Sequence, residues 1–262
     1  MLRKPIFLLS FALKLFLLGA CVSSDPVVSS TQENNEDFWL TLPEPGRITV
    51  IGVSGPRSRQ ELEIAAARED AARKISMLLG LEVSFESIQN IGSGFFDFYT
   101  DTDISLVYDM ELIDRIEGLS FNPEGDLLRR GGSLCIRFSY PVYPGPLNFD
   151  SAGIYPENPG VRPPWISRPP AEIGGFTAGV GFARRQQRLS DTIMKATESA
   201  AAALVSQFSA HVTVREVTVD FTTTVFFHQE SRGRLAHFLV LETWIDPVSQ
   251  DVWILAIAEK AD

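Results

Sequence analysis

Apolar residues recur at spacings of three and four in two stretches of the chain, which predicts two amphipathic helices. The first stretch covers residues 62–79 and is followed by Gly80, a residue type that commonly ends helices. The second stretch covers residues 189–208. Ser58 and Glu61 have the spacing of a capping box, so we expect the Ser58 hydroxyl to cap the first helix.

Runs typical of β-strands flank both helices. Residues 48–53 precede the first helix and residues 177–182 precede the second. The candidates that follow the helices are 81–88, 105–114 and 133–140 in the first half, and 211–227, 236–245 and 251–258 in the second. Residues 246–250 supply a turn between the last two strands. Consecutive strands on short connections form antiparallel sheets, so we predict an α+β fold in which one helix packs on an antiparallel sheet, twice, in the order β-α-β-β-β.

The two halves of the chain also resemble each other in sequence. Residues 51–84 align without a gap onto residues 180–213, at a constant offset of 129, and eight of the 34 positions are identical. The matches include Gly52 with Gly181 and Glu69 with Glu198, at equivalent places in the predicted elements. We interpret this pattern as an internal duplication.

Composition along the chain sets the expected boundaries. Residues 141–170 hold nine of the 16 prolines, a density that excludes helix and central strand. The sequence therefore predicts a first module at 39–141, a proline-rich linker at 142–164 and a second module at 165–262. Residues 21–38 are polar and have no apolar period, which is typical of a flexible tether, and residues 1–20 form a separate leader.

Several packing motifs recur in this arrangement. Each half has a Trp followed by a Pro, a strand with Ile-Gly or Val-Gly, and a helix with Ala-x-Glu-x-Ala-Ala, and the hairpin motif Glu-Thr-Trp-Ile-Asp-Pro closes the second half. Together they resemble the Lpp-twenty-type family of bacterial lipoproteins, which is similar to a flagellar basal-disc lipoprotein and to the N-terminal domain of a flagellar assembly protein. The resemblance extends from Trp165 to the C-terminus and, in the first half, from Trp39 to Ser84. It implies packing modules and carries over no catalytic residues.

The N-terminal residues are typical of an export signal. Arg3 and Lys4 precede an apolar run at residues 6–18, which is too short to span a membrane. The Leu-Gly-Ala-Cys that ends at Cys21 resembles the lipobox of bacterial lipoproteins. That resemblance implies cleavage before Cys21 and lipidation of its thiol. An ordinary signal peptide or an uncleaved anchor is the alternative, and Lys14 within the apolar run favours it.

A lipid on Cys21 would hold the mature chain at a membrane surface, since each buried methylene contributes about 0.8 kcal/mol. Val22 and Ser23 follow the cysteine where many inner-membrane lipoproteins carry aspartate, which favours the outer membrane. The module would then lie in the periplasm or on the cell surface.

Charge and cysteine content narrow the possible partners. Loss of residues 1–20 removes three cations and no acid, which takes the formal net charge from −10 to −13. Nucleic acid is excluded as a partner, because phosphate binding needs clustered Lys and Arg. Cys135 would have no disulfide partner once Cys21 is acylated, and we expect it to be a small buried apolar residue.

Two motifs suggest ligand binding at first sight. Residues 179–184 place three small residues and Arg184 between a strand and a helix, but a dinucleotide loop needs a small residue where Arg184 stands. Asp101 and Asp103 begin like a calcium loop, but leucines replace its required glycine and closing glutamate. We interpret the first motif as strand-to-helix packing and the second as a strand with a solvated acidic face, and we predict no cofactor and no metal site.

Three further groups of residues are candidate binding sites: the histidines, the matched glutamates and an aromatic stretch. The histidines lack the sequence spacing of metal ligands, so we expect them to be ordinary residues of the sheets. Glu69 and Glu198 form either a paired functional site or, as we favour, local bridges. The aromatic stretch forms either a contact patch or a cover for the sheet edge. The residues concerned, beyond the glutamates, are His211, His228, His237, Phe95, Phe96, Phe98 and Tyr99.

These observations lead to one functional expectation with two alternatives. We expect a lipid-anchored, non-enzymatic envelope protein that binds other envelope proteins as a scaffold. Assembly into a homo-oligomer and association with the flagellar base are both compatible with this role. A regulator of peptidoglycan synthesis at the outer membrane is the first alternative. An envelope hydrolase with an unrecognised site is the second.

Overall fold

The computed structural model describes residues 36–44, 46–92, 98–141, 162–219 and 222–261. The expected leader, Cys21, nearly all of the tether and nearly all of the proline-rich linker lie outside the described residues, as do Phe95 and Phe96. The part of the chain that is described combines helices with antiparallel sheets, which confirms the α+β class. None of its helices is long and apolar enough to cross a membrane.

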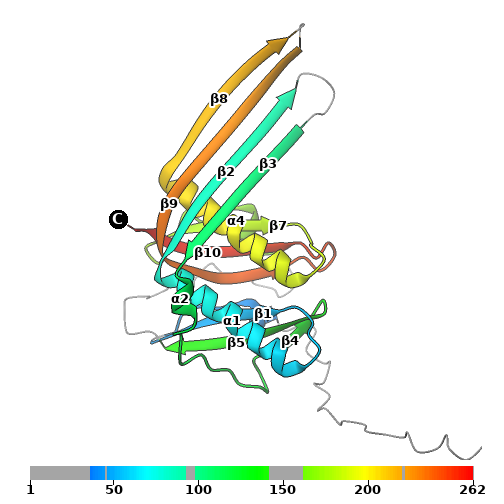
Figure 1. Ribbon diagram of the computed structural model, residues 1–262, viewed down its shortest axis with the longest axis vertical. Coiled ribbons are helices and arrows are strands. Elements are labelled where there is room, and N and C mark those ends of the chain that lie inside the picture. Colours follow the sequence, from blue (N-terminus) through cyan, green and yellow to red (C-terminus); the bar gives the residue numbers. More distant parts are fainter. Residues whose placement is uncertain (1–35, 45, 93–97, 142–161, 220–221, 262) are drawn as a thin grey trace, which may run out of the picture. The chain divides into compact units, whose positions relative to one another are not determined.

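The described residues of the first half form one long helix and five strands, which are labelled in Figure 1. A short 3-10 helix, η1 (Glu36–Trp39), precedes them. The elements that follow are β1 (Arg47–Ser54), α1 (Gln60–Leu79), β2 (Leu81–Gly92), β3 (Phe98–Tyr108), α2 (Met110–Ile113), β4 (Leu127–Arg130) and β5 (Ser133–Pro141).

The second half again contains one long helix. Its elements are α3 (Pro164–Ser167), β6 (Glu172–Ile173), β7 (Phe176–Ala183), α4 (Leu189–Ser209), β8 (Ala210–Val219), β9 (Thr222–Ile245) and β10 (Val252–Lys260). The predicted turn between the last two strands is present, because Asp246 Oδ1 accepts hydrogen bonds from the amides of Val248 and Ser249.

The strands form two sheets. A three-stranded sheet has the order β1-β5-β4, and a seven-stranded sheet has the order β3-β2-β9-β10-β7-β6, with β8 also paired to β9. All pairs are antiparallel. The first half is thus divided between the sheets, because β2 and β3 join strands of the second half. We call β3, β2, residues 222–235 of β9, and β8 the double hairpin; its four strands lie side by side in Figure 1.

Strand β9 joins the double hairpin to the rest of its sheet. Residues 222–235 pair with β8 and β2, and residues 235–245 pair with β10. The pairing with β10 shifts register in two places, and His237 lies at the second shift with a φ of 56°. Bulges of this kind bend a strand, so one strand can serve both parts of the sheet.

The core is shared between the two halves of the chain. One buried cluster joins α1 alanines and Ile136 of β5 to Trp165, Leu239 and Ile257. A second joins α4 residues and Ile254 to Ile51, Trp39 and Cys135. Burial of this apolar surface therefore depends on both halves at once.

A glycine allows the same close approach in each half. A Cβ at Gly52 would lie 1.9 Å from the carbonyl oxygen of Ala67, and a Cβ at Gly181 would lie 2.0 Å from that of Ala196. Only glycine permits a helix backbone to approach a strand this closely. This contact is the physical reason for the matched glycines, and it agrees with the packing interpretation of residues 179–184.

The helix starts also match, although the predicted capping box is wrong. Helix α1 begins one residue later than the box requires, and Ser58 makes no cap hydrogen bond. Instead, Glu63 Oε1 accepts from the amide of Arg57 at 3.1 Å. At the same offset of 129, Thr192 Oγ1 accepts from the amide of Gln186 at 2.9 Å. A side chain one turn into each helix therefore binds the loop before it.

Several strand boundaries differ from the expectation. The strand expected at 105–114 ends at Tyr108, because Asp109 caps α2 by accepting from the amides of Glu111 and Leu112. The run at 211–227 is two strands, β8 and the start of β9, and β9 then continues through to Ile245. Gly233 lies inside β9, where a Cβ would come within 2.7 Å of Val205, so it serves packing.

Candidate functional site

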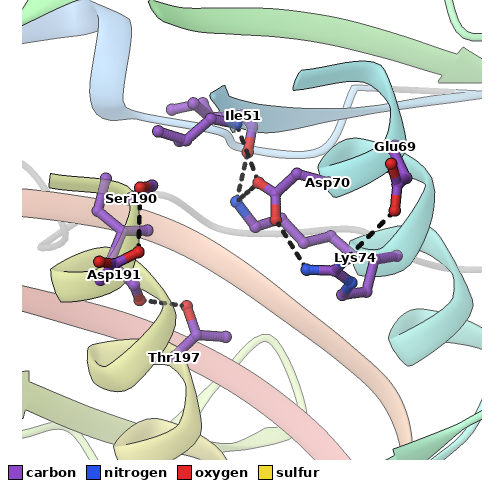
Figure 2. A network of polar contacts seen from close by, with 10 residues as sticks. Ile51, Glu69, Asp70, Lys74, Ser190, Asp191 and Thr197 are labelled. Atoms are coloured by element: carbon purple, nitrogen blue, oxygen red, sulfur yellow. Dashed lines mark hydrogen bonds and ion pairs between the residues drawn. The ribbon is translucent and has the colours of Figure 1, made fainter. Parts of the chain in front are cut away.

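A polar cavity of about 430 Å³ lies between α1 and α4. Its wall includes the loop after β1, one side of α1, the start of α4, and Leu106 and Tyr108 of β3. Figure 2 shows Asp70 and Lys74 of α1 on one side and Asp191 of α4 on the other. The volume lies in the range of small-molecule sites, which makes this cavity the candidate functional site.

The charges around the cavity balance each other. Four cations and four anions line it: Arg57, Arg73, Lys74 and Arg188, and Glu69, Asp70, Asp191 and Glu198. Opposite charges in such numbers cancel at a distance, so the cavity has no strong preference for a simple anion or cation. This balance suits a small molecule that carries both donors and acceptors.

Two of these residues are already engaged in holding α1 to β1. Lys74 Nζ donates to the carbonyl oxygen of Ile51 at 2.5 Å and to Asp70 Oδ2 at 2.9 Å. The same carboxylate oxygen of Asp70 accepts from the amide of Val53 at 2.9 Å. The side chains of Asp70 and Lys74 are four residues apart, and so neighbours on the helix surface. Their first role is therefore structural.

The Arg73 side chain has a buried donor without a hydrogen-bond partner among the described residues. Its terminal nitrogens lie 3.6 Å from Glu69 Oε1 and 3.8 Å from Asp70 Oδ1, which are ion-pair distances beyond hydrogen-bond range. Its Nε is buried and has no hydrogen-bond partner among the described residues. A ligand oxygen could accept from it.

The structure brings the matched glutamates to one cavity. Glu69 from α1 and Glu198 from α4 both line it, and Glu69 forms the ion pair with Arg73. Burial raises the pKa of Glu198, against a smaller opposite effect of nearby Lys195. The alignment of the two halves identified both glutamates. The predicted local ion pair is present for Glu69, and no ion pair is seen for Glu198 among the described residues.

A buried acid lies at the junction of the two halves. Glu242 of β9 is 8% exposed, and its Oε2 accepts from the indole Nε1 of Trp165 at 2.6 Å. Burial raises the pKa of Glu242 to about 7, although the indole hydrogen bond acts in the opposite direction. In the sequence, Trp165 and Glu242 stand out only as members of packing motifs. The available signal was an acid between Leu241 and Thr243 in a run expected to form a β-strand.

Glu63 of α1 is the other buried acid among the described residues. It pairs with Arg129 of β4, whose Nη2 donates to Glu63 Oε2, while the other carboxylate oxygen binds the amide of Arg57. The arginine hydrogen bond lowers the pKa of Glu63, an effect that exceeds the opposing effect of its burial. This pair joins α1 to the edge of the three-stranded sheet.

The remaining candidates serve local structure. His228 and His237 each contact one glutamate, Glu86 at 2.9 Å and Glu259 at 3.1 Å. His211 is exposed on β8. No group of three potential metal ligands occurs in the part of the chain that the structure describes.

Two other expectations concern Cys135 and the acidic stretch. The thiol of Cys135 is free and fully buried, as expected, and burial raises its pKa to about 12. Asp101 and Asp103 lie within β3, as expected, and not in a loop. The side chains of Phe98 and Tyr99 lie outside the described parts of β3.

Among the described residues, the cavity wall contains no histidine and no cysteine. Comparison of the chain with protein-family models, curated proteins and solved structures finds no match.

Proposed function

We propose that this protein is a lipid-anchored, non-enzymatic scaffold of the bacterial envelope that binds other envelope proteins. The observation that carries the proposal is the double hairpin, whose outer strands β3 and β8 each have one pairing partner among the described strands. A strand edge with free backbone groups is a binding surface for another strand. The leader pattern and Cys21 supply the proposed attachment to the outer membrane.

The proposal includes an origin of the fold in two copies of one β-α-β-β-β module. Three contacts support it at the same offset of 129: the two glycine approaches, the two helix-start hydrogen bonds, and a third pair. In that third pair the amide of Val53 donates to Asp70, and the amide of Phe182 donates to Ser199 Oγ at 3.2 Å. The strand orders β1-β5-β4 and β7-β10-β9 correspond as well.

Metabolic labelling with a clickable fatty acid tests the anchor. The full chain is expressed in a bacterium as wild type, as Cys21→Ser and as Cys135→Ser, which changes the other cysteine. We expect label and membrane association for wild type and Cys135→Ser, and loss of both for Cys21→Ser. Label that persists in Cys21→Ser, or a wild-type chain that carries none, would refute the anchor.

Binding is tested by chemical cross-linking of intact cells that express the wild-type chain. We expect cross-linked species that contain this chain and survive purification under denaturing conditions. Recovery of the chain as a monomer alone, at its native expression level, would argue against a scaffold.

A further inference from the structure

Two long strand edges of the double hairpin remain open in the described structure. β3 pairs with β2 alone and β8 pairs with β9 alone. They are 11 and 10 residues long, against about five to six for a typical strand. Edges of this length present a long row of free backbone N–H and C=O groups.

Both edges lack several features that usually prevent pairing, and their charged residues are Asp101 and Asp103 in β3 and Arg215 and Glu216 in β8. The sequences of β3 and β8 contain no Pro, Gly or Lys. The β2–β3 and β8–β9 registers run without a bulge. Three valines near the edges are largely exposed: Val107 by 59%, Val212 by 56% and Val214 by 57%. Proteins commonly protect a solvated edge strand with Pro, Lys or a β-bulge, and β3 and β8 have none of these. These edges are therefore suited to pairing with another strand.

We propose, on the basis of the scaffold function above, that the partner is a second copy of this chain, whose β8 pairs with β3 in a head-to-tail arrangement. The four strands alternate in direction, so β3 and β8 run in opposite directions. A copy in the same orientation therefore sets its β8 antiparallel to β3. The two edges also match closely in length.

The observed registers define which residues would meet. Ile104 pairs with Phe85, Phe85 with Ser231, and Ser231 with Ala210, so Ile104 and Ala210 lie in one row across the double hairpin. A copy placed alongside without a shift sets its Ala210 against Ile104. One residue further on, His211 then faces Asp103.

The next pair along is Val212 against Thr102. All four of these outer residues are exposed: Asp103 and Thr102 on β3, and His211 and Val212 on β8. Histidine against aspartate is a favourable cross-strand pair, and valine against threonine is a β-branched pair. The unshifted register therefore brings no like charges together at these positions.

A head-to-tail contact leaves one edge open on each terminal copy. Such contacts continue until a ring closes or a filament forms, whereas a two-fold contact of β8 with β8 stops at a dimer. The proposal therefore predicts assemblies larger than dimers.

Disulfide cross-linking tests this arrangement in membranes from cells that express the full chain. The double variant carries Thr102→Cys and Val212→Cys. Within one chain these positions are separated by three strand spacings, roughly 14 Å, which is too far for a disulfide. We expect a ladder of dimers, trimers and larger species that collapses on reduction.

Matched controls use the single variants and one exposed residue outside the double hairpin. A mixture of the two single variants should give dimers and nothing larger. Thr102→Cys combined with Val248→Cys should give no ladder, because Val248 lies in the turn before β10. All substituted side chains are exposed, so the fold should tolerate them, and circular dichroism of the purified variants checks this.

Three results would overturn the proposal. They are dimers from Val212→Cys alone without a ladder in the double variant, cross-links of the double variant to other proteins only, and absence of any cross-link. The anchor is tested separately with the parent chain, which has no introduced cysteine. Disulfide-linked species of the parent chain would indicate that Cys21 is not lipidated.

Discussion

Replacement of Glu242 by glutamine should stabilise the fold above neutral pH. Glu242 is 8% exposed as a residue, and burial raises the pKa of its carboxyl group from an ordinary value of 4.5 to about 7. A pKa difference of this size corresponds to about 3 kcal/mol. Glutamine keeps an oxygen that can accept from the Trp165 indole, while the ionisable group is removed.

The sign of the pH dependence follows from proton binding. At pH values below about 4.5 Glu242 is protonated in both states, and no cost arises. Between about 4.5 and 7 the unfolded chain loses the proton while the folded chain retains it, so the free energy of unfolding falls as pH rises. Above this window the cost of about 3 kcal/mol stays constant.

Urea denaturation of the purified chain at pH values from 5 to 8.5 measures the effect. We expect Glu242→Gln to exceed wild type in stability by an amount that grows with pH and levels off near 3 kcal/mol, as an upper bound. Glu117→Gln, which changes an exposed acid without an ion pair among the described residues, is the matched control and should track wild type. A difference between Glu242→Gln and wild type that does not change with pH would refute the reasoning.

Three other predictions concern packing, charge and reactivity. Gly181→Ala forces a Cβ to within 2.0 Å of a helix carbonyl and should cost about 1 to 3 kcal/mol in urea denaturation, whereas Gly80→Ala, with open space around its Cβ, should be near neutral. Arg129→Met leaves the buried Glu63 carboxylate without its cationic partner and should cost roughly 1 to 3 kcal/mol at neutral pH. Because the pairing lowers the pKa of Glu63, that cost should shrink as pH falls below 4.5, and a constant cost would contradict it. Cys135 should react with a thiol reagent only after urea unfolding, so rapid labelling of the folded chain would contradict its burial.

Local patterns predicted the elements that local physics determines. Helical spacing located α1 and α4, and the Asp-Pro turn located the hairpin of β9 and β10. The matched glycines were visible because a close helix–strand contact tolerates only one residue type. Gly233 resembles a strand break in sequence, but its role depends on Val205 of α4, which no local pattern contains.

The pairing of strands that are far apart in the sequence could not be predicted for a similar reason. Strand β2 pairs with β9 across more than a hundred residues, and the alternation in each strand does not name its partner. Only part of the cavity wall could be predicted. The alignment of the two halves singled out Glu69 and Glu198, but the burial of Arg73 Nε depends on how α1 and α4 pack, which the sequence does not specify.

Backbone hydrogen exchange of the wild-type chain in its membrane tests the central claim most directly. In an isolated copy, alternate amides of β3 and β8 point away from the double hairpin without a strand partner. We expect these amides to exchange more slowly in membranes than in dilute detergent, by about tenfold or more, because strand pairing between copies would protect them. Rapid exchange of the outward amides in both conditions, with the inner strands β2 and β9 protected, would contradict it.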